Sequence, residues 1–235
     1  MRKAFVVSDI HGMYESFEQL LRYWQQEDEL VILGDMIDRG PQSLEVLQKI
    51  MQLQQTHKVT VVMGNHDQML LDFLRYPKEA QSRYERNGGM ATLQSLLAEA
   101  FARPIEEYVS LIPQKRPDEL AFLAKSKRFY VFNQVLFTHA GFDTRLEDWQ
   151  LTAKDDFIWI REHYTLPNKT SYTNVFGHTP TKYINPDETN RIWLGDEGRY
   201  VAIDGGAVYG GQLNGLLIRE DGQIVQTYAI PSTDK

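Results

Sequence analysis

The chain has 235 residues, of which 42% are hydrophobic, and this length and composition are typical of a globular protein with one large domain. Its formal net charge of −7 argues against a general binder of nucleic acids or of anionic membranes. The absence of cysteine excludes disulfide bonds, thiolate metal sites and cysteine nucleophiles, and it fits a reducing compartment.

The N-terminus runs from Met1-Arg2-Lys3 directly into a short apolar stretch at residues 4–7. This stretch is too short for the apolar region of a signal peptide. No apolar run in the chain approaches the roughly 18 residues that are needed to cross a bilayer. We therefore expect a cytoplasmic protein with no membrane partner and no stable nucleic-acid partner.

The first 75 residues alternate between short apolar runs and helical patterns. We expect strands at 4–7, 30–33 and 59–63, separated by two helices, the first of which carries apolar residues at helical spacing from Phe17 to Trp24. Strands that alternate with helices in this way predict crossover connections and a parallel sheet.

Residues 68–128 show a different pattern, mostly helical and interrupted by prolines and by the turn signal Asn87-Gly88-Gly89. Lys and Arg outnumber Asp and Glu in this segment, although the whole chain is acidic. The segment is interpreted as a helical insertion. It is either a plain solvated cap or a cap that also attracts a phosphate to the functional site.

From residue 129 onward short strand patterns dominate, with one helix expected at 154–163. No internal repeat or linker divides the chain. We therefore expect an α/β fold in a single domain, 1–235, with a helical insertion at about 68–128. The strands expected in this last part cover residues 129–132, 135–138, 173–177, 191–194, 200–203, 214–219 and 223–228.

Short polar motifs directly follow five of the strand-like runs. The carboxyl ends of strands are where open α/β sheets place their ligands, and core packing does not require Asp, His and Asn beside Gly at such positions. The five motifs are Ser8-Asp9-Ile10-His11-Gly12, Gly34-Asp35-Met36-Ile37-Asp38-Arg39-Gly40, Gly64-Asn65-His66-Asp67, Thr138-His139-Ala140-Gly141 and Phe176-Gly177-His178-Thr179-Pro180.

These motifs supply oxygen and nitrogen ligands for two divalent cations. Such ligands without thiolate suit Mn²⁺, Fe²⁺ or Zn²⁺. Asp35 can bridge the two ions, and ions about 3.5–4 Å apart activate a water and clamp the oxygens of a phosphate. The six expected ligands are Asp9, His11, Asp35, Asn65, His139 and His178.

Three further residues fit the hydrolysis of a phosphate ester. Arg39 can grip a phosphate through two hydrogen bonds. His66, next to Asn65, is the candidate donor of a proton to the leaving oxygen, and Asp38 can orient it. Water would attack phosphorus directly, so no side-chain nucleophile is needed.

The first three motifs resemble the signatures of the phosphoprotein phosphatase branch of the calcineurin-like metallophosphoesterases. Later motifs, such as Ile158-Trp159-Ile160-Arg161 and Ile203-Asp204-Gly205-Gly206, resemble the small bacterial and phage-lambda type of protein phosphatase. The resemblance covers about residues 4 to 218. It implies a four-layer metallophosphatase sandwich, in which two mixed sheets are flanked by helices.

The same resemblance implies roles for individual residues. It makes His66 and Asp38 the catalytic pair, and it makes Arg39 and Arg161 the residues that grip the phosphate. The six ligands named above would hold two metals, with Asp35 shared between them. Mn²⁺ is the usual activating ion in such bacterial enzymes, and Fe, Zn and Mg are compatible alternatives.

The substrate is left open by two departures from the protein phosphatases. Asp67 stands where they usually have Glu, and both Asp67 and Ala140-Gly141 resemble the symmetrical dinucleoside tetraphosphate hydrolases. Asp38 favours the phosphatases, because the best-known tetraphosphate hydrolases often lack an acid there, although their Gram-positive relatives keep it. The predicted function is hydrolysis of phosphoserine and phosphothreonine in proteins. Symmetrical hydrolysis of bis(5'-nucleosyl)-tetraphosphate (Ap4A) is the alternative, and a non-catalytic scaffold is disfavoured because no ligand is missing.

Several residues have simpler interpretations. Asp67 is expected to support its neighbours or to cap the following helix rather than to bind a metal. Arg161 could be a surface arginine on an amphipathic helix. Tyr209 could overhang the cleft from the loop after Asp204-Gly205-Gly206, but it is expected to be an ordinary packed tyrosine. His57 and His163 lie in no motif and are given no role.

Overall fold

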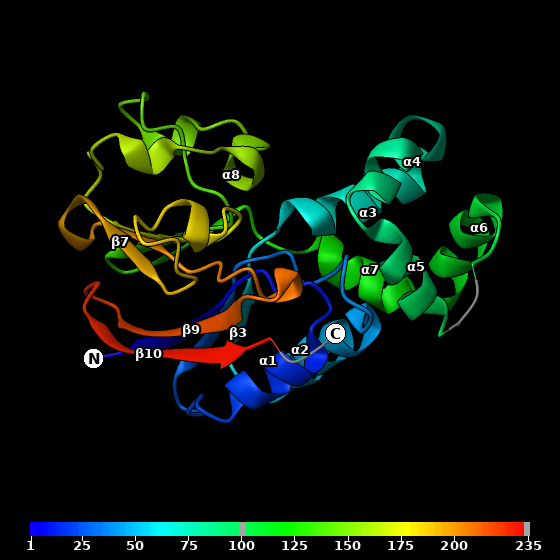
Figure 1. The fold of residues 1–235 in the computed structure, drawn as a ribbon, viewed down its shortest axis with the longest axis horizontal. Coiled ribbons are helices and arrows are strands. Elements are labelled where there is room, and N and C mark those ends of the chain that lie inside the picture. Colours follow the sequence, from blue (N-terminus) through cyan, green and yellow to red (C-terminus); the bar gives the residue numbers. More distant parts are fainter. Residues whose placement is uncertain (99–101, 233–235) are drawn as a thin grey trace.

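Two five-stranded sheets form the centre of the computed structural model, which describes residues 1–98 and 102–232 (Figure 1). The first sheet has the order β10-β9-β1-β2-β3. Strands β1, β2 and β3 are parallel to one another, β9 is antiparallel to β1, and β10 is antiparallel to β9. The parallel start that the alternating pattern predicts is therefore confirmed. The strands are β1 (Lys3–Val7), β2 (Glu29–Ile32), β3 (Val59–Val61), β9 (Gln212–Arg219) and β10 (Ile224–Pro231).

The second sheet has the order β4-β5-β6-β8-β7. Its inner strands β5, β6 and β8 are parallel, and its edge strands β4 and β7 are antiparallel to their neighbours. Both sheets are thus mixed, as the predicted sandwich requires. The strands are β4 (Phe129–Phe132), β5 (Val135–Thr138), β6 (Thr173–Phe176), β7 (Trp193–Gly195) and β8 (Tyr200–Ala202).

The two sheets pack face to face because their central strands are apolar on both sides. Val6 of β1 lies in the core between the sheets, together with Phe137 and Val175 of the second sheet. The alternate residues Phe5 and Val7 lie in the core that the first sheet shares with the helices. β1 therefore contributes to two cores, which fixes its register in the sheet.

Helices cover the outer faces of both sheets. Figure 1 shows α1 and α2 along the first sheet and α8 over the second, while α3 to α7 gather at one end of the molecule. Within the described residues, no helix is both long and apolar enough to span a membrane. The α-helices are α1 (Tyr14–Leu21), α2 (Ser43–Gln54), α3 (Asn65–Arg75), α4 (Pro77–Arg86), α5 (Gly89–Leu97), α6 (Ile105–Lys115), α7 (Pro117–Ala124) and α8 (Asp156–Trp159), and short 3₁₀ turns lie at Trp149–Leu151, His163–Thr165, Thr181–Tyr183, Asp196–Gly198 and Ala207–Tyr209.

The helix expected at 154–163 is wrong in its extent. α8 ends at Trp159 because Ile160 takes an extended ψ of 142° and Glu162 has a φ of 65°. Arg161 therefore lies in a loop rather than on an amphipathic helix. The first helix also ends early, at Leu21, so that the buried Trp24 lies beyond it.

Candidate dinuclear metal centre

The five polar motifs lie close together because each follows the carboxyl end of a strand, and these strand ends lie side by side in the two packed sheets. The amide of His178, after β6, donates a hydrogen bond of 3.0 Å to the Asp9 carboxylate, after β1. The amide of His66, after β3, donates a bond of 2.9 Å to Asp35 Oδ1, after β2. The motifs are thus joined directly, although they are far apart in the sequence.

The loops hold several of these residues in strained backbone conformations. Asp9, His11, Asp35 and His178 have φ values of 52°, 48°, 50° and 66°, in the left-handed region that favours glycine. Such residues cost of order 1–3 kcal/mol each and persist where the surrounding structure holds them, commonly at functional sites. The backbone strain is therefore concentrated at residues whose side chains are candidate metal ligands.

Two groups of buried side chains could each hold a metal ion. Each group offers ligand atoms that lie within 4.8 Å of one another, and Asp35 belongs to both. Asp35 Oδ2 lies 3.6 Å from His11 Nε2 and 3.4 Å from His139 Nε2. The groups are His11 with Asp35 and His66, and Asp35 with His139 and His178.

The histidine tautomers fit metal binding. His11 Nδ1 lies 2.9 Å from the carbonyl of Ile37, and His139 Nδ1 lies 2.6 Å from the carbonyl of Leu33. A carbonyl oxygen can only accept, so each Nδ1 carries hydrogen and each Nε2 has a lone pair when the ring is neutral. In this structure the Nε2 of His11 lies 2.7 Å from Nη1 of Arg39, which can donate to that lone pair. Within the described chain, the buried Nε2 of His178 has no hydrogen-bond partner. These three imidazoles are prepared as ligands for a cation.

Asn65 and Asp9 lie beside these groups. Asn65 Oδ1 is 3.0 Å from His139 Nε2, on the side of the second group. Asp9 belongs to neither group found among the described residues, and its carboxylate bonds the Ser8 hydroxyl and the His178 amide. Burial, reinforced by the charge of Asp35, raises the pKa of Asp9 to about 6.

The site favours positive charge. Burial, together with the charge of Asp9, raises the pKa of Asp204 well above its ordinary value. For His139, burial acts to lower the pKa, but the carboxylates of Asp35 and Asp9 outweigh it and raise the pKa to about 10. Buried carboxylates that draw a proton onto a neighbouring imidazole create the charge environment that a divalent cation would satisfy.

His66 and Asp38 form a buried pair beside the ligand groups. His66 Nδ1 lies 2.8 Å from Asp38 Oδ2, and the His66 ring lies edge-on to the His11 ring with centroids 4.7 Å apart. Because Asp38 occupies Nδ1, the Nε2 atom of His66 is left for another partner. One nitrogen of His66 is also near enough to His11 and Asp35 to act as a ligand.

The two predicted phosphate-binding arginines open onto one cavity of about 400 Å³, which also contains His11, His178 and Asp204. Arg161 Nη1 donates a bond of 2.9 Å to Thr179 Oγ1, next to His178. Besides Arg39 and Arg161, the remaining lining residues are Pro180, Lys182, Tyr183, Gly206, Val208 and Tyr209.

Tyr209 and Asp67 have contacts that decide between their interpretations. The expectation that Tyr209 is an ordinary packed tyrosine is wrong, because its side chain is 59% exposed and its ring lies 5.1 Å from the guanidinium carbon of Arg39. Asp67 accepts hydrogen bonds from the amides of Asp35, Met36 and Gly64 at 2.9–3.1 Å. It therefore supports the loops that carry the ligands, as expected.

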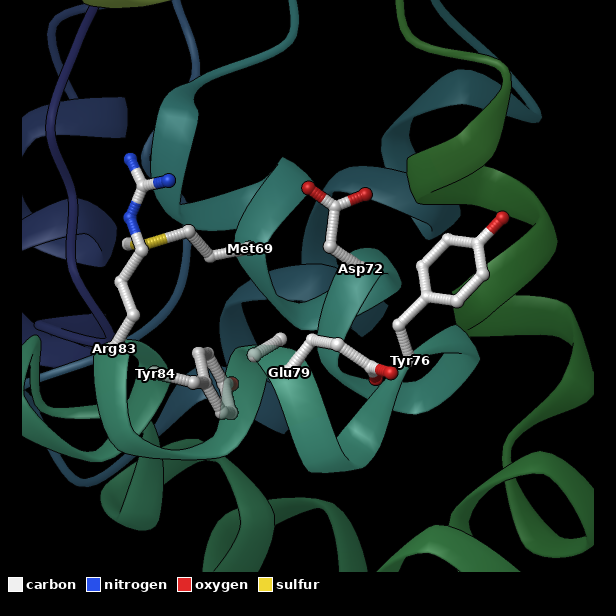
Figure 2. A pocket seen from close by; sticks show the side chains of 7 residues that line it. Met69, Asp72, Tyr76, Glu79, Arg83 and Tyr84 are labelled. Atoms are coloured by element: carbon white, nitrogen blue, oxygen red, sulfur yellow. The ribbon is translucent and has the colours of Figure 1, made fainter.

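A second hollow, of about 510 Å³, lies on α3 and α4 and is lined in part by Met69, Arg83 and Tyr84 (Figure 2). The guanidinium carbon of Arg83 lies 4.3 Å from the ring of Trp159, and that ring lies 6.0 Å from the ring of His178. The helices after β3 thus reach the far side of the site. No motif marks Arg83 or Tyr84, so the sequence carries no signal for these contacts.

Comparisons with known proteins identify the family of the chain. The family model for calcineurin-like phosphoesterases matches residues 2–206. The chain is 32% identical to serine/threonine-protein phosphatase 1 of Salmonella typhimurium over 90% of both chains. It is 25% identical to the asymmetrical bis(5'-nucleosyl)-tetraphosphatase PrpE of Bacillus subtilis, over 97% of this chain and 94% of that one.

A solved structure shows the same fold. A protein serine/threonine phosphatase from Saccharomyces cerevisiae aligns with 100% of this chain and 81% of its own, with a TM-score of 0.62 and 10% identity. The family model and the Salmonella relative together extend over most of the described residues. The chain is therefore a metal-dependent hydrolase of phosphate esters and belongs to the calcineurin-like phosphoesterase family.

Proposed function

We propose that this phosphoesterase hydrolyses phosphate monoesters of proteins, at phosphoserine and phosphothreonine. The observation that carries the proposal is the buried pair of His66 and Asp38, 2.8 Å apart, beside two ligand groups that share Asp35. The oxygen of serine is a poor leaving group and needs a proton, so this pair suits an alkyl phosphate. The 32% identity to a serine/threonine-protein phosphatase supports the same substrate.

We propose that the cofactor is a pair of Mn²⁺ ions. The donor set consists of imidazole, carboxylate and amide groups without sulfur, which is compatible with Mn²⁺ and with Fe or Zn. Bound divalent ions would neutralise phosphate charge and activate the attacking water. The proposed ligands are Asp9, His11, Asp35, Asn65, His139 and His178.

The side chains of the protein have separate tasks in this proposal. Arg39 and Arg161 bind the non-reacting phosphate oxygens from the cavity that they line. Asp38 holds Nδ1 of the His66 imidazolium, so that Nε2–H can donate its proton to the leaving oxygen. Asp67, through its three amide bonds, keeps the loop of Asp35 against the start of α3.

The proposal is tested by comparing substrates on the protein loaded with Mn²⁺. We expect the highest kcat/KM on phosphoserine and phosphothreonine peptides, a lower value on phosphotyrosine peptides and the lowest on diadenosine tetraphosphate. The same chain loaded with Mg²⁺ or Zn²⁺ tests the choice of metal. Higher kcat/KM on the dinucleotide than on every phosphopeptide would contradict the proposal.

A second candidate is a pyrophosphohydrolase of dinucleoside polyphosphates. The cavity extends beyond the ligands to Lys182, and its tyrosines Tyr183 and Tyr209 are 72% and 59% exposed. A cation and exposed aromatic rings suit additional phosphates and a base. Two ADP would indicate symmetrical cleavage of diadenosine tetraphosphate, whereas ATP with AMP would indicate the asymmetrical cleavage named for the Bacillus relative.

A further inference from the structure

We infer that the helical insertion at 68–128 carries two positioning residues for the proton donor. Tyr84 of α4 and Thr92 of α5 fix the carboxylate of Asp38, and Asp38 in turn orients the ring of His66. The inference rests on the proposed role of His66 in protonating the leaving oxygen. It gives the insertion a role in the reaction itself.

The hydrogen bonds divide the two oxygens of Asp38 between different partners. Oδ1 accepts from the Tyr84 hydroxyl at 2.9 Å and from the Thr92 hydroxyl at 2.8 Å. Oδ2 is left for His66 Nδ1, at 2.8 Å. Two donors on one oxygen fix the rotation of the carboxylate, and this rotation decides where Oδ2 and the imidazole lie.

Thr92 holds the backbone of Asp38 as well as its side chain. Its oxygen accepts the Asp38 amide at 2.8 Å, and its hydroxyl lies 2.9 Å from that of Ser43 at the start of α2. Asp38 has a φ of 72°, so its conformation has to be held by its surroundings. One threonine of the insertion therefore contacts both ends of the strained residue.

Tyr84 is confined in the orientation that this bond requires. Its ring stacks on Phe73 with centroids 5.0 Å apart, and Gly89 lies against the ring so closely that a Cβ there would collide with it. Tyr84 and Asp38 are both buried. Burial and the charge of Asp38 raise the pKa of Tyr84 well above its usual value, so the phenol keeps its hydrogen and donates it.

The turn between α4 and α5 also reaches the neighbouring Arg39. The amide of Arg39 donates a bond of 3.1 Å to the carbonyl of Gly88. Gly88 has a φ of 88°, and a Cβ at this position would lie 2.8 Å from Arg39 Cγ. The turn Asn87-Gly88-Gly89 is thus shaped to fit the loop that carries Asp38 and Arg39.

The predicted consequence depends on the leaving group. A misplaced His66 slows a substrate whose leaving oxygen needs a proton, such as phenyl phosphate or phosphoserine. It affects p-nitrophenyl phosphate much less, because p-nitrophenolate leaves without protonation. A purely structural defect would lower kcat on all of these substrates alike.

The experiment compares kcat on phenyl phosphate and p-nitrophenyl phosphate for Tyr84→Phe, with the protein loaded with Mn²⁺. We expect kcat on phenyl phosphate to fall by about tenfold to a hundredfold, and kcat on p-nitrophenyl phosphate to stay within about twofold. Phe keeps the ring that lines the hollow of Figure 2, so that no cavity is made. Thr92→Val should show the same selective loss, and Thr92→Ser, which keeps the hydroxyl, should restore kcat.

Tyr108→Phe is the matched control. Tyr108 is a buried tyrosine of α6 in the same insertion, and its hydroxyl accepts a bond of 3.1 Å from the Arg103 amide. We expect this variant to keep the ratio of the two kcat values. If Tyr84→Phe fails to fold, the Thr92 variants decide the result.

The result that overturns the inference is an unchanged ratio in Tyr84→Phe and Thr92→Val, or an equal loss on both substrates. The proposed function fails separately. Wild-type protein that hydrolyses phenyl phosphate but no phosphopeptide would contradict the proposal that phosphoproteins are the substrate. In that case, the comparison of phenyl phosphate with p-nitrophenyl phosphate would still test the roles of Tyr84 and Thr92. Wild-type protein that hydrolyses no phosphate ester would overturn both.

Discussion

His66 is held by two carboxylates: Asp38 contacts its imidazole ring, and Asp35 accepts a hydrogen bond from its backbone amide. Its Nδ1 lies 2.8 Å from Asp38 Oδ2, and its amide donates a bond of 2.9 Å to Asp35 Oδ1. The carboxylate shared by the two ligand groups and the proposed proton donor therefore hold each other in place. His66 would thus place the proton donor in a fixed position relative to the shared metal ligand Asp35.

His66→Asn tests the proton donor. We expect kcat on a phosphoserine peptide to fall by roughly 10²- to 10⁴-fold, the usual contribution of a positioned acid, because the amide cannot supply the proton. Mn²⁺ content, measured by mass spectrometry of the gel-filtered protein, should be unchanged. His57→Asn, at a half-buried histidine whose ring packs against Trp24, is the control. Near-normal turnover in His66→Asn, or loss of metal with the activity, would contradict the assignment.

Asp35→Asn tests the shared ligand. Asp35 lies in both ligand groups, so replacing its carboxylate should weaken binding of both ions, whereas His178→Ala should weaken only one. We expect about two Mn²⁺ per chain in the wild type, fewer than about one in Asp35→Asn and about one in His178→Ala. Metal content after dialysis gives the measurement. Equal metal content in the two variants would show that Asp35 is not a bridge.

Arg161→Lys tests the arginine that the structure places in a loop. Lysine keeps the charge but loses the planar pair of donors, so binding of inorganic phosphate should weaken. We expect the inhibition constant for phosphate to rise by about tenfold, which corresponds to about 1.4 kcal/mol. Arg145→Lys, at an exposed arginine paired with Asp143, is the control. An unchanged inhibition constant in Arg161→Lys would remove this residue from the phosphate site.

His163 predicts a pH dependence of stability. Burial among aromatic rings lowers its pKa from 6.5 to about 4 in the folded protein. Between these values the unfolded chain binds a proton that the folded chain does not, so stability is full above pH 6.5 and falls as the pH drops toward 4. The loss attributable to His163 amounts to roughly 3 kcal/mol.

The measurement is urea unfolding of metal-free wild type and His163→Gln at pH 7, 5.5 and 4.5. The free energy of unfolding should fall more steeply with decreasing pH in the wild type. His163 takes up a proton in the unfolded wild-type chain but not in the folded one, whereas glutamine does not titrate. The other buried acids are common to both proteins and cancel in the difference. Parallel pH profiles for the two proteins would show that His163 is not held neutral.

Much of the fold and of the proposed site could be predicted from local patterns. The parallel strands β1, β2 and β3 were visible as apolar runs between helical patterns, because burial on both faces requires apolar residues throughout. The polar motifs follow five strands, and strand ends converge in a sheet whatever lies between them in the chain. Asp35 and His66 could therefore be singled out by their motifs alone.

The tertiary structure alone decided the surroundings of that site. The hydroxyls of Tyr84 and Thr92 reach Asp38 from helices without any motif, and Tyr209 is exposed over Arg39 instead of packed. A local pattern reports which face of an element is buried, but it does not report which distant side chain completes a buried polar group. Buried carboxylates must find their donors somewhere in the fold, and only the packing of the insertion against the catalytic loop shows which donors these are.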